Sequence, residues 1–585
     1  MNVVVLNRIV HLLTLGWLTG PIFDKEMRVS SRRRRNYVLR FFYVGFFAFF
    51  LAIVWAETVP YQSTSAYQSS RMAVAGQAIV STILWFEFLT AQVIAVVMLS
   101  TSISDEIYHR TLGVLMTTPI GSFQIVIGKL LSRLLQLVLL LAISLPPLAV
   151  VRVFGGVPGD FLACGLCVTL TTAMFVGSLS LFFSIFTRRA YTVILTTIVT
   201  LGLLFLLVPL GAAFLAYYPH EPPAAFWRGL SLVNPYLILS ESTVAMQGVR
   251  VWGVVSWPIH CGAMLGASGL LLLLSTLLVR KAALRQAMGL IGLWSGRDLS
   301  NPEKNMAEGR VVRVKGPPVL WKECRIPLLG RRRTTNLVGA VVTIVLVGLT
   351  YGMCHREGCL KDGEIQSAYM IVFFAVGMLY TAVLPATCIA SEKEAQTWSL
   401  LLTTSIREWE ILAGKFGGIV RRCSPVWGLL FTHVVVFSIV GYVHPAAILQ
   451  FGLIAAWVLV FLSSTGLYFS QRFKHTTTAV ITNMGLAATL WAIIPLIAAI
   501  VTVGIGHGDS DWIEPYLDMN PFIQAGVVAS ATAHGENLHD YEWTQGGLSS
   551  VLDATAWILL TAMIHVVVGL SLTAWTRFRM RRNPL

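Results

Sequence analysis

The chain has 585 residues, of which 56% are hydrophobic and only 12% are charged, about half of the usual charged fraction. Lysine and arginine number 43 against 28 aspartates and glutamates, which gives a net charge of +15. This composition excludes a soluble globular protein, a disordered chain, a collagen and a coiled coil. The apolar residues form blocks of about 20, the length of a helix that crosses a bilayer. We therefore interpret the chain as an all-α polytopic membrane protein.

Twelve apolar blocks are long enough to span a membrane. In the first half they lie at roughly 37–56, 73–101, 131–152, 161–186, 191–216 and 251–279. In the second half they lie at roughly 336–353, 368–390, 424–442, 447–471, 477–504 and 552–576. Residues 1–20 are apolar but lack the charged start and the cleavage site of a signal peptide, so we expect an interfacial N-terminal segment.

The basic residues gather on one side of these blocks. Arginines at 32–35 precede the first block, and arginines at 577–582 follow the last one. The segment 505–550 has seven acidic residues and no lysine or arginine. The positive-inside rule then places both termini in the cytosol and the acidic segment outside. Topology and anionic lipids account for the net charge, and we expect no nucleic-acid partner.

The two halves repeat short segments in the same order. Eight residues recur 286 positions later without a gap: Glu106, Thr111, Leu115, Thr117, Thr118, Ile120, Gly128 and Lys129. Pro21, Lys25, Glu26 and Arg28 recur 297 positions later, and Asn234-Pro235 recurs as Asn520-Pro521. Such internal repetition indicates that the chain contains two copies of one unit.

Because each half has an even number of predicted spans, both halves enter the membrane from the same side. The predicted fold is therefore twelve transmembrane helices in two parallel six-helix repeats with cytosolic interfacial helices. The expected boundaries are 21–283 for the first half, 284–316 for a cytosolic basic linker and 317–585 for the second half.

The repeated segment that starts at Glu106 begins where an apolar block ends. Its apolar residues can share one helix face, and Glu106 can pair with Arg110 on another face. We expect one short interfacial helix in each half, closed by Thr-Thr-Pro at 117–119 and by Thr-Thr-Ser at 403–405. The alternative is an ordinary loop helix that lies on lipid headgroups.

These repeated motifs resemble a known family. The cytosolic signature of ABC-2 type export permeases is similar to the stretch Glu106-x4-Thr111-x3-Leu115-x-Thr117-Thr118-Pro119-Ile120-x7-Gly128-Lys129. Their N-terminal interfacial helix is similar to Pro21-x3-Lys25-Glu26-x-Arg28, and their loop before the last span resembles the Asn-Pro pairs. The chain departs from the family where a glycine is expected, at Arg110 and Gln396, at Ser405 instead of proline, and in the fusion of two halves.

The resemblance implies a permease of an ATP-driven exporter in a bacterial inner membrane, whose substrate the sequence does not identify. It implies separate ABC-type ATPase subunits as partners, in two copies, and membrane lipids around the chain. It also implies an ATPase-coupling site at Glu106, Thr111, Thr118, Pro119, Glu392, Thr397 and Thr404, with interfacial basic partners Lys25, Arg28, Lys322 and Arg325. We expect Glu106 to pair with Arg28 or a neighbouring basic residue, and Glu392 with Arg325 or its neighbours.

The sequence contains no G-x-x-x-x-G-K-[ST] phosphate loop. We therefore expect no cofactor on this chain, with ATP and Mg bound by the partner ATPase. No metal-ligand motif and no catalytic constellation stands out either. The expected protein is a permease that is not itself an enzyme.

Glu87 falls midway through the second predicted span, and its counterpart 286 positions later is Phe373. A carboxyl group inside a membrane is costly and is a functional candidate by default. The alternative interpretation is a protonated glutamate that is hydrogen-bonded between helices. Glu87 also favours an alternative function, an ion-coupled secondary transporter of six-plus-six design, although the spans are otherwise nearly free of charge. A third class, a lipid-processing enzyme, has no supporting motif.

Two features on the predicted outer side remain open. Cys354 and Cys359 flank a short polar loop and can form a disulfide outside the cell. In the acidic segment, His507, Asp509 and Asp511 can bind cations, whereas the more ordinary interpretation is a solvated loop with short re-entrant helices.

Overall fold

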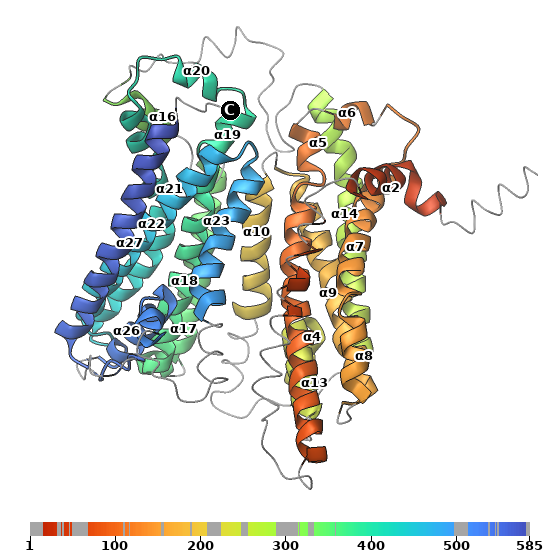
Figure 1. The fold of residues 1–585 in the computed structure, drawn as a ribbon, viewed down its shortest axis with the longest axis horizontal. Coiled ribbons are helices and arrows are strands. Elements are labelled where there is room, and N and C mark those ends of the chain that lie inside the picture. The colour runs from red at the N-terminus through yellow and green to blue at the C-terminus, as the bar shows by residue number, and fades with distance from the viewer. Residues whose placement is uncertain are drawn as a thin grey trace, which may run out of the picture. The chain divides into compact units, whose positions relative to one another are not determined.

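The structure is a computed structural model of the chain. It describes residues 16–31, 68–108, 111–153, 157–187, 190–207, 224–246, 256–287, 314–325, 333–495 and 513–580, with short gaps, and scattered residues between 37 and 48. All regular elements within these ranges are helices (Figure 1). The chain forms two compact units, Met1–Gly309 and Arg310–Leu585, and the boundary between them falls inside the expected linker.

The first unit begins with α2 (Gly16–Ser31) and α4 (Gln68–Ser100). Two short helices follow, α5 (Ser104–Tyr108) and α6 (Leu112–Leu115). The chain continues with α7 (Ser122–Leu141), α8 (Leu145–Val153), α9 (Gly159–Ser184) and α10 (Ala190–Gly202), which runs into the π-helix η2 (Leu203–Leu207). The unit ends with α12 (Ala224–Val233), α13 (Pro235–Met246) and α14 (Trp257–Ala287). Helices α4, α7, α9, α10 and α14 share one buried apolar core.

The second unit repeats this order. It contains α16 (Pro318–Arg325), α17 (Arg333–Arg356), the 3-10 turn η3 (Cys359–Lys361), α18 (Gly363–Thr387), α19 (Ala390–Glu394) and α20 (Trp398–Leu402). It continues with α21 (Glu408–Val440), α22 (Ala446–Arg472), α23 (Thr476–Ala488), the π-helix η4 (Thr489–Ile493), α25 (Ile513–Asp518), α26 (Pro521–Thr532) and α27 (Val551–Met580).

Corresponding helices make corresponding contacts in the two units. The N-terminal short helix packs on the third predicted span, as α2 on α7 and as α16 on α21 (Figure 1). The second span packs on the fourth, as α4 on α9 and as α18 on α22, and the fourth packs on the sixth, as α9 on α14 and as α22 on α27. The sequence repeat is therefore a repeat of one helical fold.

Nine helical stretches in the described part of the chain are long and apolar enough to cross a membrane. They are Gly76–Ser100, Ser122–Arg152, Gly159–Ser184, Trp257–Leu284, Gly363–Glu394, Glu408–Val440, Ala446–Arg472, Thr476–Ile493 and Val551–Met580. Each coincides with one predicted span. Of the other three, 191–216 begins as the shorter apolar helix Ala190–Phe205, 336–353 lies within α17, and 37–56 lies mostly outside the described residues. The count of twelve stays a prediction.

The third span of each half begins earlier than the sequence predicts. Helix α7 starts at Ser122 instead of 131, and α21 starts at Glu408 instead of 424. The basic residues in these first turns look like the edge of an apolar block, which is why the sequence places the boundary after them. The structure instead buries several of them against carboxylates, so the helices continue through the basic region.

Candidate functional site

The expected single helix after the second span is wrong in both units, because two shorter helices stand in its place. It is divided into α5 and α6 in the first unit and into α19 and α20 in the second. At the break, the amide of Thr111 donates to the carbonyl of Glu106 over 3.0 Å, and Thr397 donates to Glu392 over 2.9 Å. These bonds close a wider turn than the α-helix has. Arg110, the expected partner of Glu106, lies outside the described residues.

The repeated Thr-Thr pair ends each of the second short helices. The hydroxyl groups of Thr117 and Thr118 donate to the carbonyls of Val114 and Leu115, at 2.7 and 2.5 Å. Thr403 and Thr404 bind the carbonyls of Leu400 and Leu401 in the same way, at 2.9 and 2.6 Å. The last carbonyls of a helix have no partner within it, so these hydroxyls complete the helix end.

A buried lysine lies at the centre of the site in the second unit. The Nζ atom of Lys415, on α21, lies 2.9 Å from Oε1 of Glu392 on α19 and 3.1 Å from Oε1 of Glu323 on α16. It also donates to the carbonyl of Cys388 over 3.1 Å, and its side chain is only 1% exposed. A single ammonium group thereby joins three segments that are far apart in the sequence.

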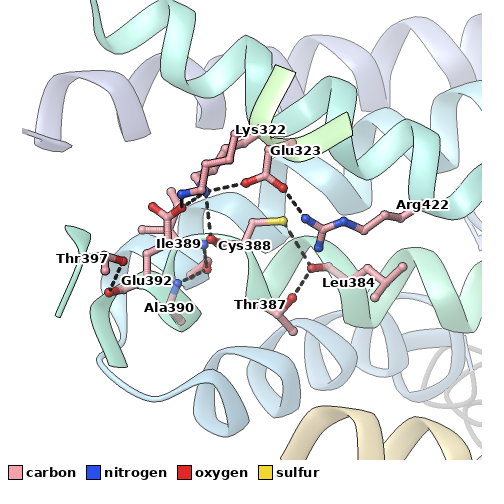
Figure 2. Close-up of polar contacts among 12 residues, drawn as sticks. Lys322, Glu323, Leu384, Thr387, Cys388, Ile389, Ala390, Glu392, Thr397 and Arg422 are labelled. Carbon is pink, nitrogen blue, oxygen red and sulfur yellow. Dashed lines mark hydrogen bonds and ion pairs between the residues drawn. The ribbon is translucent and has the colours of Figure 1, made fainter. Parts of the chain in front are cut away.

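Further charges surround this lysine. Lys322 lies 2.8 Å from Oε1 of Glu392, and Arg422 forms an ion pair with Oε2 of Glu323. Figure 2 shows the carboxylate of Glu323 turned toward Arg422 on one side and toward the contacts around Glu392 on the other. Buried carboxylates and ammonium groups are costly unless they are paired, and here each of the two glutamates has two cationic partners.

Helix α19 is also attached to its other neighbours. The amides of Ile389 and Ala390 both donate to Oγ of Ser470 on α22, at 2.8 and 2.7 Å. The carboxylate of Glu394 accepts the amide of Thr476 over 2.8 Å, which satisfies a free N–H group at the start of α23. The short helix therefore contacts α16, α21, α22 and α23 through polar bonds, and it cannot shift without disturbing them.

The first unit carries the same arrangement. The Nζ atom of Lys129, on α7, lies 3.1 Å from Oε1 of Glu106 and 3.9 Å from Oε1 of Glu26, and it donates to the carbonyl of Ser102 over 2.7 Å. Arg133 lies 3.4 Å from Oε2 of Glu26. The side chain of Lys129 is 7% exposed, so this copy is slightly more open than the one in the second unit.

We call these two sets the lysine clusters: Glu26, Glu106, Lys129 and Arg133 in the first unit, and Glu323, Glu392, Lys415 and Arg422 in the second. The arginine occupies different sequence positions in the two copies. Arg133 follows Lys129 by four residues, whereas Arg422 follows Lys415 by seven. Both spacings place the arginine on the lysine's face of the helix, so the same pairing is kept with a shift of about one turn.

The surroundings of Glu106 favour its ionised form. Burial alone would raise the pKa of Glu106, but the positive charge of Lys129, a hydrogen bond from Thr111, and the charge of Lys25 together lower that pKa. The hydroxyl of Thr111 donates directly to Oε2 of Glu106. It also lies 3.4 Å from the backbone carbonyl of Glu106, and in the second unit the hydroxyl of Thr397 donates to the equivalent carbonyl of Glu392 over 3.3 Å.

The basic partners named from the sequence lie on α2 and α16. Lys322 contacts Glu392, so a neighbour of Arg325 takes the place expected for Arg325. Arg325 itself lies over the ring of Trp321, with 4.2 Å between the guanidinium carbon and the ring centroid. In the first unit, Lys25 and Arg28 are exposed on α2. Lys129 forms the ion pair with Glu106, and the charge of Lys25 also acts on that carboxylate.

The sequence interpretation did not include Lys129, Lys415, Glu26 or Glu323 among the site residues. A signal for them existed, because all four belong to the repeated positions and the two lysines interrupt otherwise apolar helices. Their pairing depends on α2 and α16 packing against α7 and α21, and no local pattern encodes that contact.

Apolar side chains project from the short helices and the turns beside them. Val114 on α6 and Leu400 on α20 are equivalent positions and are both 67% exposed. Phe123 and Trp409, at the second residue of α7 and α21, are also equivalent and at least half exposed. Thr118, Pro119 and Thr404 lie exposed between these apolar residues. We call these exposed apolar residues the tip of each unit: Val114 and Phe123 in the first unit, and Leu400 and Trp409 in the second.

Glu87 is 0% exposed, and neither of its carboxylate oxygens has a hydrogen-bond partner among the described residues. The hydroxyl of Tyr43 is likewise buried and unpartnered within the described part of the chain. The ring of Tyr43 packs on Phe86 at a centroid distance of 5.6 Å. In the second unit, Phe373 takes the place of Glu87 and packs on His433.

The outer features of the sequence have different outcomes. Cys354 and Cys359 are buried free thiols, and Sγ of Cys359 donates to the carbonyl of Cys354 over 3.2 Å. His507, Asp509 and Asp511 lie outside the described residues. Short helices α25 and α26 occupy the acidic segment, and α12 and α13 occupy the equivalent place in the first half.

A comparison with protein families agrees with this repeated architecture. The family described as ABC-2 family transporter protein matches the chain twice, at residues 21–293 and 297–581, which together cover nearly its whole length. No curated protein and no solved structure matches the chain. Members of this permease family are membrane transport components without a nucleotide-binding domain of their own. The chain belongs to the ABC-2 family of transporter proteins, as a multi-pass membrane permease with two family units in one polypeptide.

Proposed function

We propose that this permease is energised by separate ABC-type ATPase subunits, which dock at α5–α6 in the first unit and at α19–α20 in the second. ATP and Mg are then bound by the ATPase, and the permease moves its substrate outward across a bacterial inner membrane. The observation that carries this proposal is the pair of lysine clusters. They join the short helices to the first turns of a spanning helix, and therefore provide a mechanical link between a docked subunit and the membrane core.

The tips support a protein partner at the same place. Exposed apolar groups next to polar ones are typical of interaction surfaces, and tryptophan is enriched at their energetic centres. Phe123 lies six residues before Lys129 on α7, which is about 9 Å further along the helix axis. A partner that contacts the tip therefore binds nearer the start of the spanning helix than the ion pairs lie. When such a partner moves the short helix, the ion pairs pass that movement to the spanning helix. Two equivalent tips fit two ATPase subunits.

A photo-cross-linking residue at position 400 tests the docking site directly. The matched control is position 439, because Ile439 is also exposed but lies at the other end of the same helix as Trp409. We expect cross-links from position 400 to a co-expressed P-loop ATPase, none from position 439, and ATP hydrolysis only in the complex. Substrate movement that is driven by an ion gradient without ATP, together with no ATPase cross-link from position 114 or 400, would favour the six-plus-six secondary transporter instead.

The glutamates test the link between docking and transport. The double variant Glu106→Gln and Glu392→Gln removes one of the two carboxylates that pair with each buried lysine but preserves side-chain size. We expect this permease to insert normally, and to bind the ATPase more weakly or to hydrolyse ATP without equivalent transport. Unchanged ATPase binding and unchanged transport in the double variant would contradict the proposed coupling route.

A further inference from the structure

The fifth span of each unit changes its helical winding at the same place. In the first unit α10 runs into the π-helix η2 at Leu203–Leu207, and in the second unit α23 runs into η4 at Thr489–Ile493. The two π-helices begin 286 positions apart, which is the spacing of the repeat. A π-turn is wider than an α-turn and is rare, and it occurs frequently at functional sites. Its presence in both units indicates a feature that is retained despite their divergence.

One asparagine in each unit binds this π-helix from a distant part of the chain. Nδ2 of Asn234 donates to the carbonyl of Phe205 over 2.8 Å, and Nδ2 of Asn520 donates to the carbonyl of Trp491 over 2.7 Å. Each bond spans 29 residues of sequence, and both asparagines are buried. The bonded carbonyl is the third residue of the π-helix in both copies.

The same side chain also begins the next helix. Oδ1 of Asn234 accepts the amide of Tyr236 over 2.9 Å, and Oδ1 of Asn520 accepts the amide of Phe522 over 3.0 Å. This is the bond of a helix N-cap, and the following proline suits the first helical position. The carboxamide group therefore binds two helices at once, with its oxygen on α13 or α26 and its nitrogen on the fifth span. Among the common N-cap residues, only asparagine supplies both an acceptor and an N–H donor at this reach.

Aromatic rings repeat around each link. The ring of Phe205 packs against Phe175 on α9 at a centroid distance of 5.8 Å, and the ring of Trp491 packs against Phe461 on α22 at the same distance. Phe175 and Phe461 are again 286 positions apart. The π-helix is thus held both by an aromatic contact to the fourth span of its unit and by the asparagine.

We propose that Asn234 and Asn520 are positioning residues that make the fifth span and the short helices beyond it move as one body during transport. The backbone carbonyls of a π-helix are not held by the regular hydrogen bonds of an α-helix. The fifth span can therefore change its winding at this place. The asparagine transfers such a change to α12–α13 or α25–α26. The role in transport rests on the proposed function, whereas the link itself can be measured on the permease alone.

The test separates the two bonds that the carboxamide makes. Asn→Asp and Asn→Ser at both positions retain an N-cap acceptor for α13 and α26 but remove the N–H donor to the π-helix. Asn→Ala removes both bonds and is the reference for loss of the cap. Hydrogen exchange of the full-length permease in nanodiscs reports on amides 203–207 and 489–493 separately from amides in α13 and α26.

We expect the Asp and Ser variants to exchange about ten-fold faster in the two π-helices, since the loss of one hydrogen bond to a buried carbonyl has an effect of that order. Their α13 and α26 amides should stay protected, and only the Ala variant should lose protection there. If the π-helix amides of the Asp and Ser variants exchange at the same rate as in the wild type, the proposed link is wrong.

The role in transport needs a second measurement on the permease with its ATPase. We expect ATP to change exchange protection in α13 and α26 of the wild type, and we expect this response to be lost in the Asp and Ser variants at unchanged ATPase binding. Variants that respond to ATP as the wild type does would overturn the positioning role. A wild-type permease that binds no ATPase contradicts the proposed function, and the exchange of the π-helices still decides whether the link exists.

Discussion

The Nζ atom of Lys415 lies 2.9 Å from Oε1 of Glu392, and the equivalent atoms of Lys129 and Glu106 lie 3.1 Å apart. In both units the pair joins the first turns of a spanning helix to the short helix that follows the second span. The second copy is the more buried and carries the additional contact of Lys322 with Glu392. The two halves thus share one arrangement, which is more deeply buried in the second unit. Mutation of the buried lysine should therefore reduce stability more in the second unit than in the first.

Lys415→Met should destabilise the permease more than Lys129→Met. The methionine leaves Glu323 and Glu392 close together without their shared cation, and breaking a buried ion pair in this way costs about 3–5 kcal/mol. Lys129 is more exposed and lies 3.9 Å from Glu26, so solvent can compensate for part of its loss. The melting temperatures of the two variants in nanodiscs measure the order.

A double variant is the control for that order. Adding Glu392→Gln to Lys415→Met removes one of the two carboxylates that have lost Lys415 as a partner, and it should recover part of the lost stability because the two residues interact directly. A Lys129→Met variant that melts below Lys415→Met, or a double variant in which the two losses simply add, would be inconsistent with the lysine as the centre of the cluster.

The ion pair of Glu106 should withstand mild acid. Its pKa is lowered in the folded protein, so its contribution to stability is complete above the unfolded value of about 4.3 and is lost as pH falls through the lower folded value. The difference in melting temperature between the wild type and Glu106→Gln should therefore be constant from about pH 8 to 5 and shrink only below about pH 4. A difference that disappears between pH 7 and 6 would show that another group controls this contact.

Much of this site could be predicted from the repeat. Identical residues at one spacing located Glu106 and Glu392, the Thr-Thr helix ends and the Asn-Pro pairs, because a duplicated unit retains the residues that its fold needs. The family resemblance then placed α2 and α16 beside the short helices. These inferences depend on sequence order and local patterns, which a single sequence contains.

The pairing partners depend on packing and could not be predicted in the same way. Glu323 contacts Lys415 across 92 residues of sequence, and Asn520 contacts Trp491 across 29. A helix such as α21 also continues through Lys415 and Arg422 because carboxylates from α16 and α19 neutralise them. Hydropathy alone assigns such charges to a boundary, so the predicted span begins too late.

Gln396 has a φ of 57° and is the one non-glycine residue with a positive φ in the described part of the chain. It occupies the position where the signature of ABC-2 type permeases has glycine. The left-handed conformation has a steric cost of about 1–2 kcal/mol for a residue with a Cβ atom. Glycine avoids this steric cost and instead loses backbone entropy worth about 0.5–1 kcal/mol. Gln396→Gly should therefore raise the free energy of unfolding slightly, and Gln396→Val should lower it.

The control for this substitution is Ser399→Gly. Ser399 is exposed within α20, where glycine has no conformational advantage, so this variant should lower stability by up to about 1 kcal/mol. Thermal unfolding of the three variants measures the comparison. Equal losses in Gln396→Gly and Ser399→Gly would mean that the turn between α19 and α20 is not strained at Gln396.

Glu87 should react as a neutral carboxylic acid. A fully buried carboxylate without a hydrogen-bond partner is far more costly than the neutral acid, because the charge has lost its hydration. Dicyclohexylcarbodiimide is apolar, enters bilayers and forms a stable N-acylurea with a carboxyl group in an apolar site. Mass spectrometry of the permease treated at pH 7.5 should find this adduct on Glu87, and Glu87→Gln should abolish it.

A water-soluble carbodiimide provides the opposite selectivity. It should modify exposed acids such as Asp540 and leave Glu87 unmodified, because the charged reagent does not reach the core of the first unit. If Glu87 reacts equally with both reagents, its carboxyl group is in contact with water. The burial of Glu87 would then not hold in the functioning protein. Because Phe373 replaces this glutamate in the second unit, the apolar reagent should label the middle of the second span only in the first half.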